Sequence, residues 1–119
     1  MIKLSDSEWI IETKLWDNGS MTITELTKSL KDETNWSKST IITLLKRMEE
    51  KGACYFEQED KAKRFYPGIS RNEAEIEETT SFLDKIYSGN VGLMISNLIK
   101  SDKLSKKDIE ELQKILEDN

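Results

Sequence analysis

The chain contains no histidine, and it contains one cysteine, one proline and five glycines among 119 residues. The absence of histidine removes the commonest general base and the commonest metal ligand. Cys54 alone can form neither an internal disulfide nor a zinc cluster, and it has no histidine to activate it as a nucleophile. The glycines form no phosphate-binding pattern. We therefore predict that the chain is not an enzyme and that it holds no metal or cofactor.

Long hydrophobic runs are also absent. No apolar stretch approaches the ~20 residues that a membrane-spanning helix needs, and the N-terminus lacks an apolar secretory segment. A single cysteine suits a reducing compartment. These features predict a cytoplasmic protein that has no membrane partner.

Positive charge is scarce as well, since 18 basic residues stand against 23 acidic ones and the formal net charge is −5. This balance disfavours nucleic acids, because neutralisation of phosphates dominates their affinity for proteins. The charge is unevenly distributed, however: residues 1–70 carry 11 basic and 12 acidic groups, whereas residues 71–119 carry 7 and 11. Residues 37–48 include three basic side chains and no acidic one. The local field there favours a polyanion, although we expect weak non-specific binding.

The segment 35–52, NWSKSTIITLLKRMEEKG, predicts a helix with one buried and one free face. Ile41, Leu44, Leu45 and Met48 recur at helical spacing and form the apolar face. The other face carries hydroxyl groups, an isoleucine and cations, which is a composition typical of a helix that enters a DNA groove. An ordinary solvated helix face is the alternative interpretation. The candidate DNA contacts on this helix are Ser37, Lys38, Ser39, Thr40, Ile42, Thr43, Lys46 and Arg47.

Two β-prone runs follow this helix and predict a hairpin. Ala53–Gln58 and Lys63–Ile69 are separated by a charged tip at Glu59–Ala62. Pro67 cannot donate a ladder hydrogen bond, so it predicts an edge position for the second run. The tip could reach the DNA backbone or an adjacent minor groove, and a flexible charged loop is the alternative. The candidate contacts on the hairpin are Lys61, Lys63 and Arg64.

Capping boxes mark the starts of two earlier helices. Ser5 is followed by Glu8 at the required spacing, and Thr22 is followed by Glu25. Three helices and then a hairpin is the order of a winged helix-turn-helix domain, which we place at residues 1–70.

Glu12 falls within the apolar face of the first predicted helix, between Leu15 and Trp16 in helical phase. We predict a partly buried carboxylate that has a raised pKa or a nearby lysine partner. The alternative is a helix that is rotated enough to leave Glu12 in water. Trp9 and Trp16 lie seven residues apart on one face, which favours core packing over ligand binding.

Residues 71–119 predict three amphipathic helices that are too few to bury a core alone, since domains below ~60 residues bury little surface. Association of two copies would cover these faces, and two linked DNA-binding domains match a two-fold operator. The alternative is that the faces cover the N-terminal domain of the same chain. The candidate dimerisation residues are Ile76, Phe82, Leu83, Ile86, Tyr87, Val91, Met94, Ile95, Leu98, Ile99, Ile109, Leu112, Ile115 and Leu116. The predicted fold class is mainly α: a winged helix-turn-helix with a small β-wing, plus a C-terminal helical dimerisation domain.

Three segments, which together span nearly the whole chain, resemble the penicillinase and methicillin-resistance repressor family. They are LSDSEW…LW at Leu4–Trp16, WSKSTIITLLKRMEEKG at Trp36–Gly52, and FLDKIYSGNVGLMISNLIKSDKLSKKDIEELQKIL at Phe82–Leu116. The resemblance implies a dimeric winged-helix repressor of transcription, with antibiotic-resistance genes of the β-lactam response as its targets. It also implies a partner, a sensor-pathway protease whose cleavage in the C-terminal half relieves repression.

Some residues depart from the family pattern. Members usually carry a basic residue at the position of Ile42 and often another at Ser39, so a different operator or a lower affinity is expected. Ile42 could instead contact a thymine methyl group. The cleaved bond of the family is Asn-Phe, and Asn97–Leu98 is the corresponding candidate here. The cysteine pair of the copper-responsive branch is absent, which argues against copper sensing.

Two other functions remain open at this point. One is a winged-helix one-component sensor whose C-terminal half binds a small molecule or a partner protein. The other is a protein-interaction scaffold without DNA binding, which the acidic pI of about 4.9 favours. An enzyme is a remote third, because the sequence offers no nucleophile–base pair.

Overall fold

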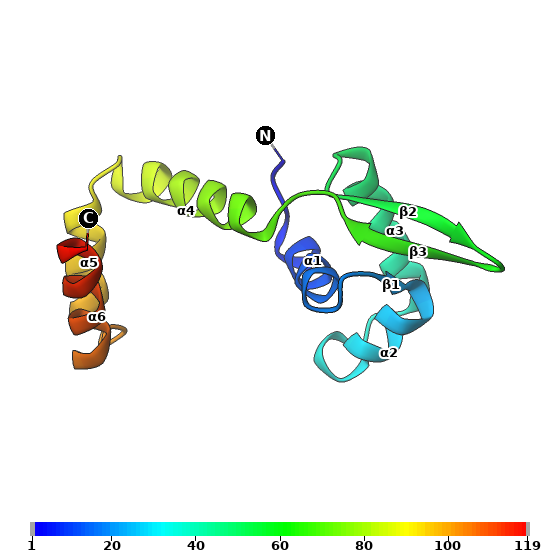
Figure 1. Ribbon diagram of the computed structural model, residues 1–119, viewed down its shortest axis with the longest axis horizontal. Coiled ribbons are helices and arrows are strands. Elements are labelled where there is room, and N and C mark those ends of the chain that lie inside the picture. The colour runs from blue at the N-terminus through cyan, green and yellow to red at the C-terminus, as the bar shows by residue number, and fades with distance from the viewer. Residues whose placement is uncertain (1, 119) are drawn as a thin grey trace. The chain divides into compact units, whose positions relative to one another are not determined.

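The computed structural model describes residues 2–118, whose elements are shown in Figure 1. In chain order they are α1 (Asp6–Asn18), β1 (Met21–Thr22), α2 (Ile23–Thr34), α3 (Lys38–Glu50), β2 (Cys54–Glu59), β3 (Ala62–Pro67), α4 (Arg71–Tyr87), α5 (Val91–Lys100) and α6 (Lys106–Glu117). The fold is mainly helical with a small antiparallel sheet, which confirms the predicted class. The chain divides into two compact units, Met1–Ile76 and Glu77–Asn119. The division falls within α4, beyond the boundary that we expected at residue 70.

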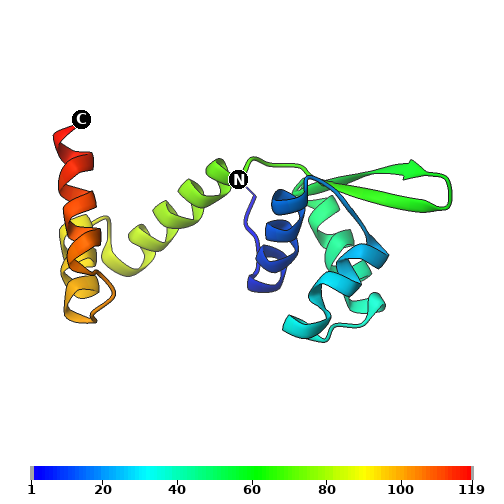
Figure 2. The same ribbon diagram turned by 60° about the horizontal axis from the view of Figure 1, so that its bottom comes forward.

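The first unit packs α1, α2 and α3 around one apolar core, and the hairpin of β2 and β3 projects beyond the helices (Figures 1 and 2). The largest fully buried apolar side chains come from all three helices: Ile11, Leu15, Leu26, Leu30, Ile41, Leu45 and Met48. Trp9 and Trp16 pack against this core, and their rings meet edge to face with centroids 5.6 Å apart. Trp16 also donates from Nε1 to the carbonyl oxygen of Ile69 at 3.0 Å. The tryptophans are therefore structural, as predicted.

The helices begin where their capping residues lie. Ser5 and Thr22 both form complete capping boxes, with Glu8 and Glu25 respectively as the reciprocal acceptors. Each box satisfies two backbone N–H groups that a helix start would otherwise leave unpaired. Gly19 ends α1 at a φ of 82°, a backbone conformation that side chains with a Cβ rarely adopt. These local signals fix where α1 stops and where α2 starts.

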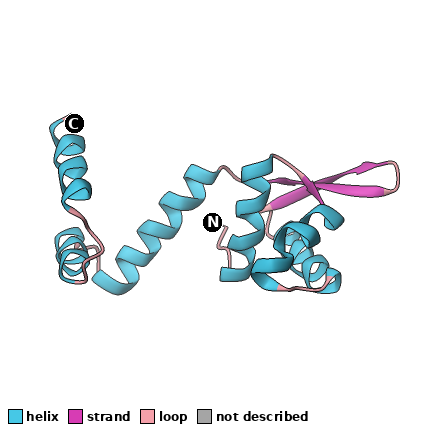
Figure 3. Cartoon of the chain, turned by 90° about the horizontal axis from the view of Figure 1, so that it is seen from below, coloured by secondary structure: helices cyan, strands magenta, loops and turns pink. Residues whose placement is uncertain are grey.

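The sheet has three strands in the order β1-β3-β2. Figure 3 shows the strands in magenta beside the helices. β1 pairs Met21 with Phe65, so the strand that contains Pro67 is central. The prediction of an edge strand was therefore wrong. Pro67 is tolerated because it is the last residue of β3 and pairs only with Cys54 of β2, beyond the end of β1.

Glu12 is fully buried in the core, and neither of its carboxylate oxygens has a hydrogen-bond partner in the part of the chain that the structure describes. Burial raises the pKa of Glu12 to about 8, and the negative charge of Glu8 adds to the effect. The raised pKa confirms the prediction, but the burial is complete where we expected it to be partial. The nearby lysine, Lys51, forms an ion pair with Glu8 rather than with Glu12, since Lys51 Nζ lies 2.7 Å from Glu8 Oε1.

Glu8 is also buried, but it is well paired. It accepts hydrogen bonds from the Ser5 backbone and from Lys51, which itself donates to the carbonyl oxygen of Lys3. Burial by itself would raise the pKa of Glu8, but the bonds from Lys51 and Ser5 outweigh it and lower the pKa below its usual value. Two carboxylates one turn apart are thus held in opposite protonation states by their surroundings.

The second unit differs from the first because it has no core of its own. No side chain described between residues 77 and 118 is fully buried. Its helices still have well-made ends: Asn90 caps α5, and Ser105 forms a capping box with Asp108 at the start of α6. No described helix has both the length and the hydropathy that crossing a bilayer requires.

We predict that Glu12→Met raises the free energy of unfolding at pH 7 by an amount on the order of 2 kcal/mol, because it removes an unpaired buried carboxyl. The pKa of Glu12 is about 8 in the folded chain and near 4.5 once it is unfolded. Unfolding therefore releases a proton between these two pH values, and stability falls as pH rises through that window, by about 1.4 kcal/mol per unit at most. Urea unfolding at pH 5, 6, 7 and 8 measures both effects.

Glu12→Gln is the matched control for this prediction, because it removes the titration but keeps a buried polar group. It should flatten the pH dependence with a smaller gain in stability. Glu8 does not confuse the result, since its lowered pKa acts below the window. A Glu12→Met chain that is less stable than the wild type at pH 7 would contradict the assignment.

Candidate nucleic-acid interface

The free face of α3 is the centre of the candidate interface. Burial of Ile41, Leu45 and Met48 fixes the rotation of this helix against the core. The eight residues predicted to contact DNA are all solvent-exposed: Ser37, Lys38, Ser39, Thr40, Ile42, Thr43, Lys46 and Arg47. The structure thus brings together one surface of hydroxyl groups, an isoleucine and three cations along a single helix. Such side chains can donate to phosphates and to the acceptor edges of bases.

Three of these hydroxyl groups already make local hydrogen bonds. Ser37 is the N-cap of α3, and its oxygen accepts from the backbone N–H of Thr40 at 3.2 Å. The Thr40 hydroxyl lies 3.1 Å from the same oxygen. Thr43 donates to the carbonyl oxygen of Ser39 at 3.1 Å. This bond fixes the Thr43 rotamer and leaves its oxygen available as an acceptor towards solvent.

A groove runs between α3 and the hairpin, and the start of α2 closes one side of it. Its wider part, of about 280 Å³, is lined by Thr22, Ile23, Thr24, Lys38, Ile42, Lys61, Ala62 and Lys63. Ile42, Ile23 and Lys63 also line the narrower part, of about 170 Å³, together with Leu45, Lys46, Glu49 and Phe65. The sequence did not predict the α2 residues of the groove. The capping box at Thr22 fixed the helix start but carried no information about its distance from Lys38.

The hairpin that forms the other wall is the predicted wing. Its strands pair from Cys54 with Pro67 to Glu59 with Ala62, which leaves Asp60 and Lys61 as the turn. Lys63 lies on the side of the sheet that faces the groove, and its ammonium group is 4.2 Å from the centroid of the Phe56 ring. The aromatic face steadies the lysine without neutralising it. Lys61 and Lys63 therefore both border the groove.

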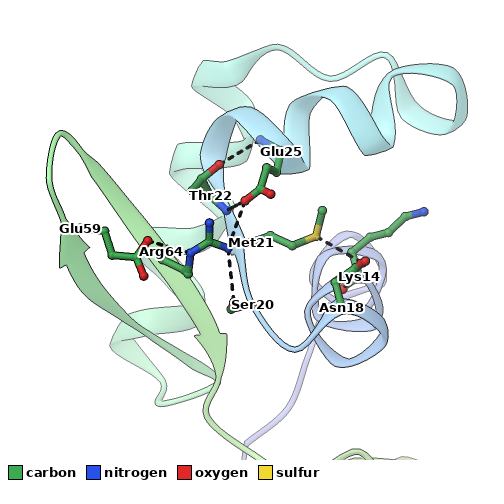
Figure 4. A network of polar contacts seen from close by, with 8 residues as sticks. All are labelled: Lys14, Asn18, Ser20, Met21, Thr22, Glu25, Glu59 and Arg64. Carbon is green, nitrogen blue, oxygen red and sulfur yellow. Dashed lines mark hydrogen bonds and ion pairs between the residues drawn. The ribbon is translucent and has the colours of Figure 1, made fainter.

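Arg64 lies on the opposite side of the hairpin, because side chains alternate along β3. Figure 4 shows its guanidinium between two carboxylates: Nε is 3.0 Å from Glu59 Oε2, and Nη1 is 3.2 Å from Glu25 Oε1. Nη1 also donates to the hydroxyl of Ser20 at 3.3 Å. The hydrogen bond to Glu59 is the main reason that the pKa of Arg64 is raised. The positive charge of Arg64, which the sequence suggested as a DNA contact, is thus paired with Glu25 and Glu59.

Cys54 takes no part in the candidate interface. It is buried, and its thiol lies 3.6 Å from the carbonyl oxygen of Leu45. Burial raises the pKa of this thiol to about 12, and the nearby acids Glu12, Glu49 and Glu8 add to the effect. A protonated, buried thiol is a poor nucleophile and a poor metal ligand. Over residues 2–118 no group of three or more acidic or cysteine side chains is placed to hold a metal ion.

An exposed polar helix, supported by a three-helix core and flanked by a lysine-bearing hairpin, defines a winged helix-turn-helix protein of the kind that binds DNA. The sequence profile of the penicillinase repressors matches residues 4–118, and the chain belongs to that family. The family consists of transcriptional repressors, which are not enzymes.

Individual relatives agree with this assignment. The chain is 32% identical over 117 residues to the penicillinase repressor of Bacillus licheniformis, covering 98% of this chain and 91% of that protein. It is 25% identical over 114 residues to the methicillin resistance regulatory protein MecI of Staphylococcus aureus, covering 96% and 93%. Among solved structures it is similar to the monomeric form of Bacillus licheniformis BlaI in complex with the blaP half-operator, at a TM-score of 0.54 and 29% identity, over 60% of this chain and 88% of that one.

The Arg64 contacts generate a testable difference between the cations of the wing. Each phosphate contact that is lost lowers the slope of log affinity against log salt by about 0.9. We expect Lys61→Ala and Lys63→Ala each to lower this slope, whereas Arg64→Ala should leave it unchanged because Glu25 and Glu59 already balance that charge. Titrations on one duplex between about 50 and 200 mM salt measure the slopes. An Arg64→Ala slope that falls as far as that of Lys61→Ala would show instead that Arg64 contacts the backbone.

Proposed function

We propose that this chain represses transcription by binding a two-fold operator as a homodimer, with one α3 helix entering the major groove of each half-site. The observation that carries the proposal is the acid-free surface of α3 from Ser37 to Met48, held outward by the core and flanked by the lysines of the wing. Membership of the penicillinase repressor family supports the same function. The names of the relatives support genes of antibiotic resistance as the regulated class.

Each part of the surface has a proposed role. Lys46 and Arg47, two turns into α3, lie where side chains reach base edges or flanking phosphates. Ser39, Thr40 and Thr43 offer small hydroxyl groups that let the helix approach the bases closely. Ser37 and Lys38, in the first turn, suit a phosphate that faces the free N–H groups of the helix start. Lys61 and Lys63 would hold the adjacent backbone.

The homodimer rests on the second unit. The predicted dimerisation residues form two sets that differ in exposure, and none of these residues is fully buried. The half-buried set is Leu83, Tyr87, Met94, Ile95, Leu98, Ile109 and Leu112. The exposed set is Phe82, Ile86, Val91, Ile99, Ile115 and Leu116, together with Ile76 of the first unit. So many apolar side chains without a buried core are expected of helices that pack against a second copy.

Dimerisation would also strengthen the binding of an acidic chain to DNA. One head on one half-site has few cations, and linking two heads makes the second contact intramolecular. The solved relative is a monomeric form on a half-operator, which supports one α3 surface per half-site. The half-sites of this chain would then be related by the two-fold axis of the dimer.

Proteolytic relief of repression is an extension of this proposal. The candidate bond Asn97–Leu98 lies inside α5, where Asn97 is exposed and Leu98 is half-buried. The Asn97 side chain donates to the Tyr87 hydroxyl at 3.3 Å. A sensor-pathway protease that cuts here would separate most of α5 and α4 from α6 and so weaken the dimer. The helix must unwind locally before such a cut.

We predict that Lys46→Ala and Arg47→Ala each weaken operator binding by about 1–3 kcal/mol, because each removes a charged contact to a base or a phosphate. Gel-shift or anisotropy titration at fixed salt measures the loss. Lys14→Ala is the matched control, since Lys14 pairs with Glu33 at 3.0 Å on α1 and α2, outside the groove. Unchanged affinity for both α3 variants would overturn the assignment of this face.

A second prediction concerns the dimer. Ile99 is 47% exposed, so Ile99→Glu should leave the monomer folded but place a charge in the proposed interface. We expect this variant to sediment as a monomer at micromolar concentration and to lose affinity for a full operator more than for a half-site. Lys100→Glu adds the same acid one position along α5 and should remain dimeric. A wild-type chain that is itself monomeric would contradict the proposal.

A further inference from the structure

We propose that Ile42 contacts the 5-methyl group of a thymine in each half-site, so that the groove beside the wing selects this base. The inference rests on the proposed function and adds to it the chemical feature that the surface reads. It assigns to the groove between α3 and the hairpin one occupant, a DNA strand whose base carries a methyl group at its major-groove edge.

The exposure of Ile42 is the first observation. In the described part of the first unit only Ile42, Tyr55 and Ile76 are large hydrophobic residues with exposed side chains, and Ile42 alone belongs to α3. It is 44% exposed, whereas the adjacent Ile41 is fully buried. An isoleucine at the centre of a polar face gains nothing from water. A partner with an apolar group at this position would remove the apolar surface of Ile42 from water and so gain binding free energy.

The neighbours of Ile42 specify the nature of that partner. Lys38, Ile42 and Lys46 follow one another at four-residue spacing, so the isoleucine lies between two lysines on one row of the helix, about 6 Å along the axis from each of them. Lys63 of the wing faces the same side chain across the groove. An apolar group that is surrounded by cations fits a ligand with a small apolar feature beside negative charges. A thymine methyl group in the major groove, with phosphates on either side, has this character.

The distribution of acids shows which end of the groove the strand would occupy. The wider part contains Lys38, Lys61 and Lys63 and no acidic side chain. The narrower part contains Glu49 as well as Lys46 and Lys63, which reduces its attraction for a phosphate. The two parts meet at Ile42 and Ile23. A strand in the wider part would therefore place its phosphates among the lysines and its methyl group on the isoleucine floor.

The Ile42 side chain has no hydrogen-bonding group, so it cannot recognise any other base through a hydrogen bond. An isoleucine can neither donate to guanine nor accept from cytosine, so it gives no preference between pairs except through apolar contact. Thymine is the one DNA base with an exposed methyl group in the major groove. Discrimination at this position is thus expected to come from the methyl group alone.

Replacement of thymine by deoxyuridine tests the inference directly, because it removes only that methyl group. Each thymine in one half-site of a duplex enriched by the full-length protein is replaced in turn, and the affinity is measured by anisotropy. We expect one position at which the replacement weakens binding about fourfold, as the loss of one buried methyl group predicts. With Ile42→Ala the same replacement should have no effect, and with Ile42→Val the preference should persist.

Lys46→Ala is the control, since it should weaken binding to the thymine and uracil duplexes equally and keep the fourfold ratio. An unfolding temperature of Ile42→Ala equal to that of the wild type would show that the variant is folded. A duplex that is enriched but insensitive to uracil at every position would overturn the methyl contact and leave the proposed function standing. The same holds for a uracil effect that survives in Ile42→Ala. Failure to enrich any duplex would overturn the proposed function and this inference with it.

Discussion

The burial of Ile41, Leu45 and Met48 fixes the rotation of α3 about its own axis, and the candidate interface depends on this constraint. A helix rises 1.5 Å and turns 100° per residue, so fixing one face determines the other. Burial of the apolar face turns the cations and hydroxyl groups at the intervening positions towards solvent. Core packing against α1 and α2 thus positions the exposed side chains of the candidate interface without any direct bond to them. A loss of core volume would therefore change the orientation of this surface.

The second constraint is the arrangement of charge in an acidic chain. Acids and bases nearly balance in the first unit, yet no acid lies in the wide part of the groove. Glu25 and Glu59 instead hold Arg64 on the far side of the hairpin, where its charge neutralises part of theirs. The network also joins β3 to the start of α2, which bounds the groove. A protein of negative net charge can in this way present a locally positive surface.

Local signals in the sequence predicted much of this structure. The capping boxes, the exposed residues of α3, the hairpin and the raised pKa of Glu12 follow from short-range spacing or helical phase. Features that depend on residues far apart in the chain did not. β1 pairs with β3 across more than forty residues, so the central place of β3 in the sheet was missed. The Arg64–Glu25 ion pair and the α2 side of the groove were missed for the same reason, because Glu25 and Thr22 approach the wing only in the folded chain.

The most direct test of the account is selection of bound sequences from random duplex DNA by the full-length protein. If a homodimer places one α3 helix in each half-site, the enriched motif has two inverted half-sites whose centres are separated by one helical turn, about 34–36 Å, or by a multiple of it. The two-fold symmetry would reflect the dimer, and the half-site would reflect the α3 surface. Enrichment of a single unpaired motif, or of no motif at any salt concentration, would contradict it.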